Sequence, residues 1–211
     1  MLQTQRLNIN LIPSDSINKE VIKFARKISR NTSPLFILDN KFNFVHLTLY
    51  SPAFPKSNLK KILLEIEQLS SYFNDINSSF TSIDSHKGYI EIKVDLSPEL
   101  FNVHKQIIKK INPLRNGYIR TKYSSMSPYF KEMNDEQIAN IKRYGMPNIM
   151  NLYRPHITLI RLHDFRKAKE LASELKWRLQ RFKSNTLGVF DMGPDGTCTH
   201  LIKKFKLGVL N

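Results

Sequence analysis

The amino-acid sequence predicts an α+β fold of two similar halves: two antiparallel sheets with helices on the outside, and a central groove between pseudo-twofold halves. Alternating apolar and polar residues mark short strands, while apolar residues three or four positions apart mark helices. One order of elements occurs twice: a strand containing His-x-Thr, an amphipathic helix, a strand, a tight turn and a strand. No linker or low-complexity stretch divides the chain, so we expect residues 1–211 to form a single bilobal domain.

The first half is expected to contain four strands and two helices. Pro13 and the pair Ser51-Pro52 end the first two strands, because proline removes a backbone donor. Ser57 can cap the second helix, and Gly88 provides the turn between the last two strands. We expect the strands at 6–12, 42–50, 79–83 and 89–94, and the helices at 17–29 and 57–69.

The second half begins with a helix start at Ser97-Pro98-Glu99, where a cap, a proline and an acidic residue stand in the preferred order. That helix ends before Pro113. An insert at 114–150 follows, with a short helix between Asn134 and Gly145. After the insert we expect a strand at 153–161, a helix at 164–183, and closing strands at 186–191 and 198–207.

The composition favours a basic protein of the cytoplasm. Thirty-three Lys and Arg residues against 18 Asp and Glu give a formal net charge of +15, which attracts nucleic acid or phosphorylated small molecules, or serves solubility alone. No apolar run is long enough to cross a membrane, and the first residues lack the pattern of a secretory signal. Cys198, the one cysteine, excludes an internal disulfide and a cysteine-built metal site. We expect no membrane partner and no obligatory protein partner, and the oligomeric state stays open.

Two motifs carry the chemistry that the sequence predicts, His46-Leu-Thr-Leu49 and His156-Ile-Thr-Leu159. Residues i and i+2 of a strand share a face. Each histidine therefore lies beside its threonine, Thr48 or Thr158, while the leucines point into a core. A chance pair of such motifs is roughly a one-in-a-thousand event. We therefore interpret the four residues as functional rather than as ordinary strand residues.

Two imidazoles and two hydroxyls suit the cleavage of a phosphodiester. One imidazole, with an ordinary pKa of about 6.5, can accept a proton from the attacking group while the other donates a proton to the leaving oxygen. The hydroxyls can donate hydrogen bonds to the non-bridging oxygens, where charge develops. This chemistry requires no metal and no cofactor. The sequence leaves open which histidine is the base, with a slight preference for His156.

The paired motifs in their duplicated frame resemble the 2H phosphoesterase superfamily, which includes bacterial RNA 2',3'-cyclic phosphodiesterases, also called 2'-5' RNA ligases. The resemblance covers nearly the whole chain, and Arg161 matches an arginine common in the ligase-like branch. The stretch from Arg143 to His156 is also similar to a bacterial branch of unassigned function, sometimes encoded beside phosphonate-metabolism enzymes. After the first motif, Tyr50-Ser51-Pro52 departs from the aromatic and Leu-Gly pair usual in the ligase-like branch.

The resemblance implies a catalytic set of His46, Thr48, His156 and Thr158. One histidine would activate water while the other protonates the leaving ribose oxygen, which opens a 2',3'-cyclic phosphate to a 2'-phosphate. The substrate would be an RNA end or a nucleotide, and the reverse reaction would be 2'-5' ligation. Two alternatives stay open: a phosphoesterase acting on a non-nucleic-acid cyclic phosphate, and an RNA-binding module with a vestigial site.

Three residues are candidates for substrate binding. Tyr50, four residues after His46, is expected on the motif face, where it can stack on a base or else cover the core. Arg154 has an even offset from His156 and projects on the same side. Arg161 has an odd offset, so it shares that face only if the strand bulges, and a surface ion pair is the alternative role.

Other basic and aromatic residues receive simpler interpretations. His104 is expected to be solvated on its helix, and the basic side chains of the helix at 164–183 are expected to form a solvated face. The aromatic and basic segment at 118–130 is expected to be a loop beside the groove, a lid or a packing insert.

Overall fold

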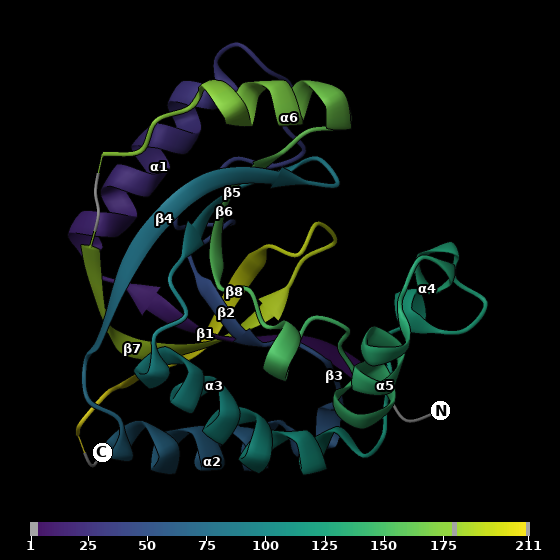
Figure 1. Ribbon diagram of the computed structural model, residues 1–211. Coiled ribbons are helices and arrows are strands. Elements are labelled where there is room, and N and C mark those ends of the chain that lie inside the picture. Colours follow the sequence, from purple (N-terminus) through teal and green to yellow (C-terminus); the bar gives the residue numbers. More distant parts are fainter. Residues whose placement is uncertain (1–3, 179–180, 210–211) are drawn as a thin grey trace.

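An eight-stranded sheet, antiparallel at every pairing, runs through the part of the chain that the computed structural model describes, residues 4–178 and 181–209. Its order is β2-β1-β7-β4-β5-β6, with β3 beside β1 and β8 beside β7 (Figure 1). The strands are β1 (Thr4–Pro13), β2 (Leu47–Tyr50), β3 (Ala53–Pro55), β4 (Ile76–His86), β5 (Tyr89–Val94), β6 (His156–Arg161), β7 (Arg181–Met192) and β8 (Cys198–Lys206).

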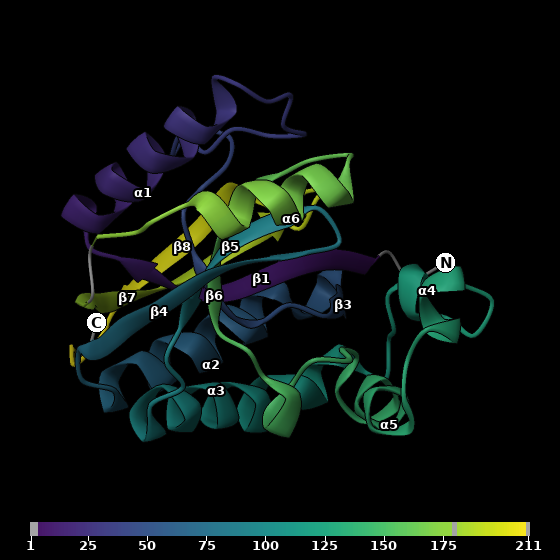
Figure 2. The ribbon, with the colours of Figure 1, turned by 45° about the horizontal axis from the view of Figure 1, so that its top comes forward.

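Helices cover the outer sides of this sheet, as Figures 1 and 2 show. One pair, α1 and α6, packs on β4, β5 and β6, and the other pair, α2 and α3, packs on β2, β4, β7 and β8. The helices are α1 (Asp15–Ser29), α2 (Leu59–Tyr72), α3 (Pro98–Ile111), α4 (Pro128–Lys131), α5 (Asp135–Tyr144) and α6 (Phe165–Glu174). Short 3-10 turns lie at Lys56–Asn58, Asn112–Arg115, Thr121–Tyr123 and Met150–Leu152.

The predicted α+β fold with outer helices is confirmed, and the two predicted sheets are continuous with each other. The first residues of β4, Ile76 to Ser79, pair with β7, while its later residues, Phe80 to His86, pair with β5. At 11 residues, β4 is long enough to belong to both halves. The strands of the first half and those of the second are therefore joined by backbone hydrogen bonds.

The predicted helix boundaries at 97–98 and 134–145 are confirmed, and each has a local cause. The Ser97 hydroxyl accepts a hydrogen bond from the Leu100 amide, and Pro98 stands where no amide partner is needed. Asn134 and Gln137 form a reciprocal capping box. Gly145 ends the same helix at a φ of 77°, a left-handed conformation that glycine adopts without steric cost.

Two predicted elements are too long. The helix expected at 164–183 ends at Glu174; the chain is already extended at Leu175, and residues 179 and 180 lie outside the described part. Apolar spacing continues past Glu174 because Trp177 packs edge-on against Phe24 and Phe80, not because the helix continues. The strand expected at 42–50 reduces to β2, preceded by a single bridge between Phe44 and Cys198.

The expectation that His104 is solvated is wrong. Its side chain is 1% exposed, and its ring stacks on Tyr153 with 3.7 Å between the ring centroids. The Nδ1 of His104 donates to the Leu49 carbonyl at 2.9 Å, and its Nε2 accepts from the Met150 amide at 3.1 Å. If the ring took up a second proton, that proton would be on Nε2 and would point at the Met150 amide N–H. Burial also lowers the pKa of His104 to about 4. The imidazole is therefore neutral in the folded protein.

Replacement of His104 by Gln should reduce the pH dependence of stability. The unfolded chain takes up a proton near pH 6.5 and the folded chain only near pH 4, so stability falls as pH falls through this interval. Each such histidine contributes at most about 1.4 kcal/mol per pH unit. Urea unfolding between pH 5 and 7 should show a smaller slope for His104→Gln, and an unchanged slope for the exposed His163→Gln. An equal slope for both variants would contradict the neutral, buried His104.

Candidate functional site

The two His-x-Thr motifs line one cavity. His46, Thr48, His156 and Thr158 all contribute to the wall of a cavity of about 510 Å³ on the inner side of the sheet. The first pair comes from the start of β2 and the second pair from β6. Segments far apart in the chain are brought together because the halves share one sheet and face each other across the groove. The sequence-predicted residues thus share one site.

Both motif strands bulge at the same place, the leucine that follows His-x-Thr. In β2, Thr48 pairs with Asn10 and Tyr50 with Ile9, which leaves Leu49 as an extra residue. In β6, Thr158 pairs with Glu91 and Ile160 with Ile90, which leaves Leu159 as the extra residue. An extra residue in one strand of a pair changes the side on which the later side chains project.

The bulges determine on which side of the strand two candidate substrate-binding side chains lie. The expectation that Tyr50 stacks on a substrate base is wrong, because the bulge turns its side chain toward the core, where it is 0% exposed. Its hydroxyl lies 2.8 Å from both Asn112 Oδ1 and the Tyr144 carbonyl. The bulge in β6 has the opposite consequence. Arg161 pairs with Tyr89, whose ring lies 4.6 Å from its guanidinium carbon, beside the cavity.

Arg161 and Arg154 lie in different relations to the cavity. Arg161 is held 2.7 Å from the Asp195 carboxylate, so the ion pair considered for it is present. Tyr89 and Asp195 line the cavity, whereas Arg161 contacts these two residues and is not itself part of the lining. Arg154 lines the cavity and is exposed.

The two histidine rings are held in the same way. The Nδ1 of His46 lies 2.8 Å from the Phe44 carbonyl, and the Nδ1 of His156 lies 2.8 Å from the Arg154 carbonyl. A carbonyl oxygen only accepts hydrogen bonds, so in each ring Nδ1 carries a proton. This leaves Nε2 of each histidine as the atom available for proton transfer.

His46 is buried, which keeps its ring neutral. Its side chain is 9% exposed. Burial is the largest cause that lowers the pKa of His46, to about 4, and the nearby His156 lowers it further against the opposing effect of the Phe44 carbonyl. With Nδ1 protonated and the ring neutral, Nε2 of His46 has a free lone pair.

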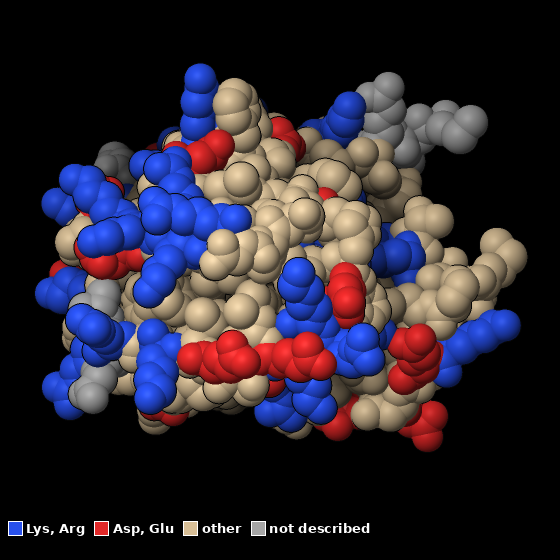
Figure 3. Space-filling view, turned by 90° about the horizontal axis from the view of Figure 1, so that it is seen from above, with Lys and Arg blue, Asp and Glu red and all other residues tan. Residues whose placement is uncertain are grey.

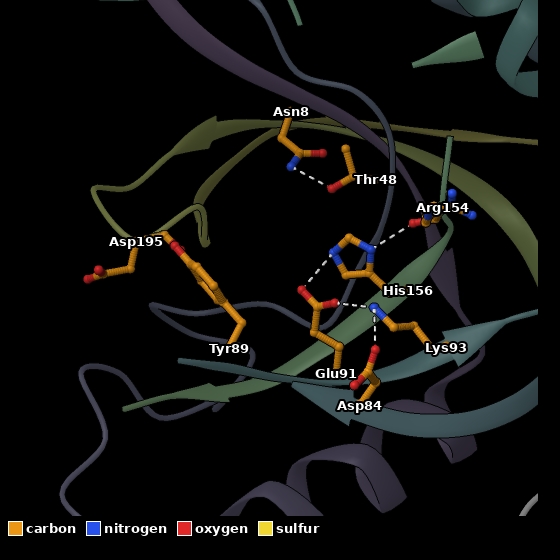
Figure 4. A network of polar contacts seen from close by, with 9 residues as sticks. All are labelled: Asn8, Thr48, Asp84, Tyr89, Glu91, Lys93, Arg154, His156 and Asp195. Atoms are coloured by element: carbon orange, nitrogen blue, oxygen red, sulfur yellow. Dashed lines mark hydrogen bonds and ion pairs between the residues drawn. The ribbon is translucent and has the colours of Figure 1, made fainter. Parts of the chain in front are cut away.

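His156 instead faces a carboxylate. The Nε2 of His156 lies 3.3 Å from Glu91 Oε1, as Figure 4 shows, and Glu91 is 7% exposed. The other carboxylate oxygen of Glu91 lies 2.7 Å from Lys93 Nζ. Because a carboxylate accepts and Nδ1 already donates to a carbonyl, this contact is a hydrogen bond when His156 carries two protons. Glu91 is therefore a polar partner for Nε2 of His156.

Glu91 is a site residue that the sequence analysis missed. In Tyr89-Ile-Glu-Ile-Lys-Val94, the polar residues alternate with apolar ones, so Tyr89, Glu91 and Lys93 share one face of β5. That alternation was visible in the sequence. The pairing of β5 with β6, which places Glu91 beside Thr158, was not.

Two buried asparagines orient Thr48. Asn10 Nδ2 donates to Asn8 Oδ1 at 3.2 Å, and Asn8 Nδ2 donates to Thr48 Oγ1 at 3.0 Å (Figure 4 shows the second bond). Both asparagines are 0% exposed on the same face of β1. Since the Thr48 oxygen accepts from Asn8, its own O–H proton is left to donate elsewhere. The polar positions of the first strand were a signal for these residues.

The insert at 114–150 forms one wall of the cavity. Arg120, Lys122, Tyr123 and Tyr129 line it from the segment before and within α4. Met146, Pro147 and Asn148, which follow α5, also line it. The expectation of a basic and aromatic loop beside the groove is confirmed.

A second and larger groove, of about 980 Å³, lies between α1 and α6 on the outside of the sheet. Its wall includes six basic side chains, and Lys and Arg gather on the left of the face in Figure 3, where α1 lies. These side chains are Lys23, Lys27, Arg30, Lys167, Lys176 and Arg178. None of the motif residues lines this groove, so this concentration of exposed positive charge lies away from the histidines.

Within residues 4–178 and 181–209, no group of three or more His, Cys, Asp or Glu side chains is arranged to hold a metal ion. In the same ranges no helix combines the length and apolar character needed to span a bilayer.

The hydrogen bonds at Nδ1 predict the tautomers of both motif histidines. Nitrogen-15 NMR of the imidazoles should show His46 with its proton on Nδ1, neutral from pH 8 to pH 5 and titrating near pH 4. Signals are assigned by loss in His46→Gln and His156→Gln, with the exposed His163 as the reference. A proton on Nε2 of His46 at pH 7 would contradict the hydrogen bond to Phe44.

Residues 53–193, most of the chain, match a family described as "Protein of unknown function (DUF1045)". No curated protein shows significant similarity in sequence.

Solved structures with the same fold cover nearly the whole chain. The crystal structure of TT0787 of Thermus thermophilus has a TM-score of 0.60 at 12% identity, over 98% of this chain and 100% of that one. E. coli LigT complexed with 3'-AMP has a TM-score of 0.57 at 11% identity, over 98% and 100%. A phosphoesterase has a TM-score of 0.54 at 14% identity, over 98% and 100%. The chain therefore shares the fold of these solved structures.

Proposed function

Because this chain belongs to the DUF1045 family and has the LigT fold, we propose that it is a phosphodiesterase that opens a 2',3'-cyclic phosphate by two-histidine acid/base catalysis. The observation that carries the proposal is that two imidazoles, each with Nδ1 bound to a carbonyl, line one cavity with two threonine hydroxyls. The substrate is a nucleotide or an RNA end, in keeping with neighbours named LigT and phosphoesterase.

The surroundings of the two histidines support opposite roles. His46 is neutral with a free lone pair on Nε2, which suits a general base. Nε2 of His156 contacts the Glu91 carboxylate, and this contact is a hydrogen bond when the ring carries two protons, which suits a general acid. This assignment reverses the slight preference drawn from the sequence, in which neither burial nor Glu91 was visible.

The reaction then proceeds by in-line attack at phosphorus. Nε2 of His46 takes a proton from water as the water oxygen forms its bond to phosphorus. The bond from phosphorus to the 3' oxygen of the ribose breaks, and Nε2 of His156 gives its proton to that oxygen, which leaves a 2'-phosphate. The hydroxyls of Thr48 and Thr158 donate to the non-bridging oxygens. If the 5'-hydroxyl of a second ribose attacked phosphorus in place of water, the same displacement of the 3' oxygen would give a 2'-5' linkage.

One alternative substrate class is supported by a specific observation. The motif cavity is separate from the broad basic groove between α1 and α6, so the residues that would cleave the phosphodiester are not on the surface that would attract a polyanion. A small non-nucleic-acid cyclic phosphate would use the cavity alone. A cavity of about 510 Å³ is within the range for small-molecule ligands.

Turnover of adenosine 2',3'-cyclic phosphate in the presence of a chelator tests the proposal. His46→Ala and His156→Ala should each lower kcat by about 100-fold or more, because each removes one of the two proton transfers. His200→Ala, an exposed histidine outside the cavity, should keep the wild-type kcat. Activity that survives both motif variants, or that the chelator abolishes, would refute the two-histidine mechanism.

The pH–rate profile tests the assignment of roles. Activity should rise as pH increases past about 4, where His46 becomes neutral and can accept a proton. Glu91→Gln removes the carboxylate beside Nε2 of His156, so it should lower kcat while this acidic limb stays in place. If Glu91→Gln moved the acidic limb, the assignment of His46 as the base would be contradicted.

A further inference from the structure

A cluster of cations lies at one end of the motif cavity, where β1 begins beside the insert. The N-terminal end of β1 lies on the side of the molecule that carries α4 and α5, as Figures 1 and 2 show. Arg120 and Lys122 line the cavity together with the ring of Tyr123. The guanidinium carbon of Arg120 lies 5.3 Å from the centroid of Tyr123, and Lys122 Nζ lies 4.8 Å from it. Arg6 of β1 is close enough to repel Arg120 electrostatically.

Carboxylates do not neutralise this cluster. Within the described residues, neither Arg6, Arg120 nor Lys122 forms an ion pair with a carboxylate, whereas the neighbouring Lys87 pairs with Glu132 and Arg161 pairs with Asp195. Arg120 is 9% exposed, and its Nε has no hydrogen-bond partner. In Arg6, both Nε and Nη2 are buried without a partner. Buried charged donors that lack an acceptor carry a free-energy cost.

Arg115, in the same insert, shows the contrast. It is also buried, at 3% exposure, but its guanidinium donates to Asn112 Oδ1 and to the carbonyls of Tyr118, Lys142 and Arg143. Arg115 therefore has a structural role, because protein oxygens satisfy its donors. The donors of Arg120 and Arg6 have no comparable set of oxygens, which indicates that the missing acceptor is a ligand.

The cluster is within reach of a substrate held by the motifs. Arg6 and Asn8 lie two residues apart on one face of β1, which is about 7 Å along the strand. Asn8 is the residue that holds the Thr48 hydroxyl. One small molecule can therefore contact Thr48 at one phosphate and the cluster with another group.

The positive charges of the cluster match a ligand that carries two negative charges. Burial first, and then the nearby Arg120 and Arg6, lower the pKa of Lys122 to about 7, although much of this side chain is exposed to solvent. The pKa of Arg120 is lowered by burial, and that of Arg6 by burial and by Arg120. A phosphomonoester carries close to two negative charges and three acceptor oxygens at neutral pH, which matches the two basic side chains that line this end of the cavity, Arg120 and Lys122.

We propose that Arg120 and Lys122, with Arg6 close to Arg120, form a second phosphate-binding site, and that the substrate is a small cyclic phosphodiester that also carries a phosphomonoester. The inference rests on the proposed function for the cyclic phosphate and adds the chemical class of its substrate. The phosphomonoester belongs to a 5'-phosphorylated nucleotide or to a phosphorylated sugar, two sources with the same anion.

The first test compares adenosine 2',3'-cyclic phosphate with the same compound carrying a 5'-phosphate. The wild-type protein should prefer the 5'-phosphorylated substrate by at least about tenfold in kcat/KM, because the 5'-phosphate would accept charge-assisted hydrogen bonds from the basic side chains. Arg120→Gln and Lys122→Gln should reduce this ratio toward one, while Lys109→Gln, an exposed lysine of α3, should keep it. Lys122 is exposed, so its variant should fold even if the variant of the buried Arg120 does not. A wild-type ratio of one, or a ratio unchanged in both variants, would overturn the proposal.

The second test measures binding without turnover. Calorimetric titration of 5'-AMP and of ribose 5-phosphate into wild type and His46→Ala should give similar affinities for the two proteins, and at least about tenfold weaker binding to Lys122→Gln. Binding of ribose 5-phosphate as tight as that of 5'-AMP identifies a sugar phosphate as the source, and much tighter binding of 5'-AMP identifies a nucleotide. If cyclic substrates are not turned over but this binding persists, the proposed function fails and the second site stands. Binding that does not depend on Lys122 overturns the site.

Discussion

The hydrogen bond from each motif Nδ1 to the carbonyl two residues upstream is the interaction on which the chemistry of the cavity depends. It fixes the ring orientation and the tautomer with backbone atoms alone, so any sequence that keeps the strand keeps the geometry. The bulge at the following leucine has a similar function, because it ends the regular pairing directly after the threonine in both β2 and β6. His104 supports the first bulge by donating to the carbonyl of the extra residue, Leu49.

The two halves repeat this backbone and differ in the side chains that face it. The strand beside β2 presents Asn10 opposite Thr48, whereas the strand beside β6 presents Glu91 opposite Thr158. Neutral amides in one half and a carboxylate with its lysine in the other make the surroundings of two equivalent imidazoles unequal. A duplicated frame thus provides symmetric positions, and the residues on the neighbouring strands give the two imidazoles different surroundings.

The sequence was sufficient for the order of the main elements, the caps of α3 and α5 and the two motifs, because each depends on residues within one turn or one strand. It was not sufficient for features that depend on pairing between distant strands. Tyr50 was misplaced because an even offset implies one face only in a regular strand, and the bulge at Leu49 depends on the register with β1. Glu91 was missed because it stands far from His156 in the chain. His104 was misjudged because its partners, Leu49 and Met150, come from other elements. In the last helix, the apolar spacing past Glu174 could not distinguish a continuing helix from Trp177 packing on Phe24.

The continuity of the sheet through β4 has a mechanical consequence. Two lobes joined only by a loop could swing apart like a hinge to admit a ligand. Here such an opening would break the ladder that β4 makes with β7 on one side and β5 on the other. The separation of the two imidazoles is therefore held by the continuous sheet. The insert at 114–150 forms one wall of the cavity and is not part of this sheet.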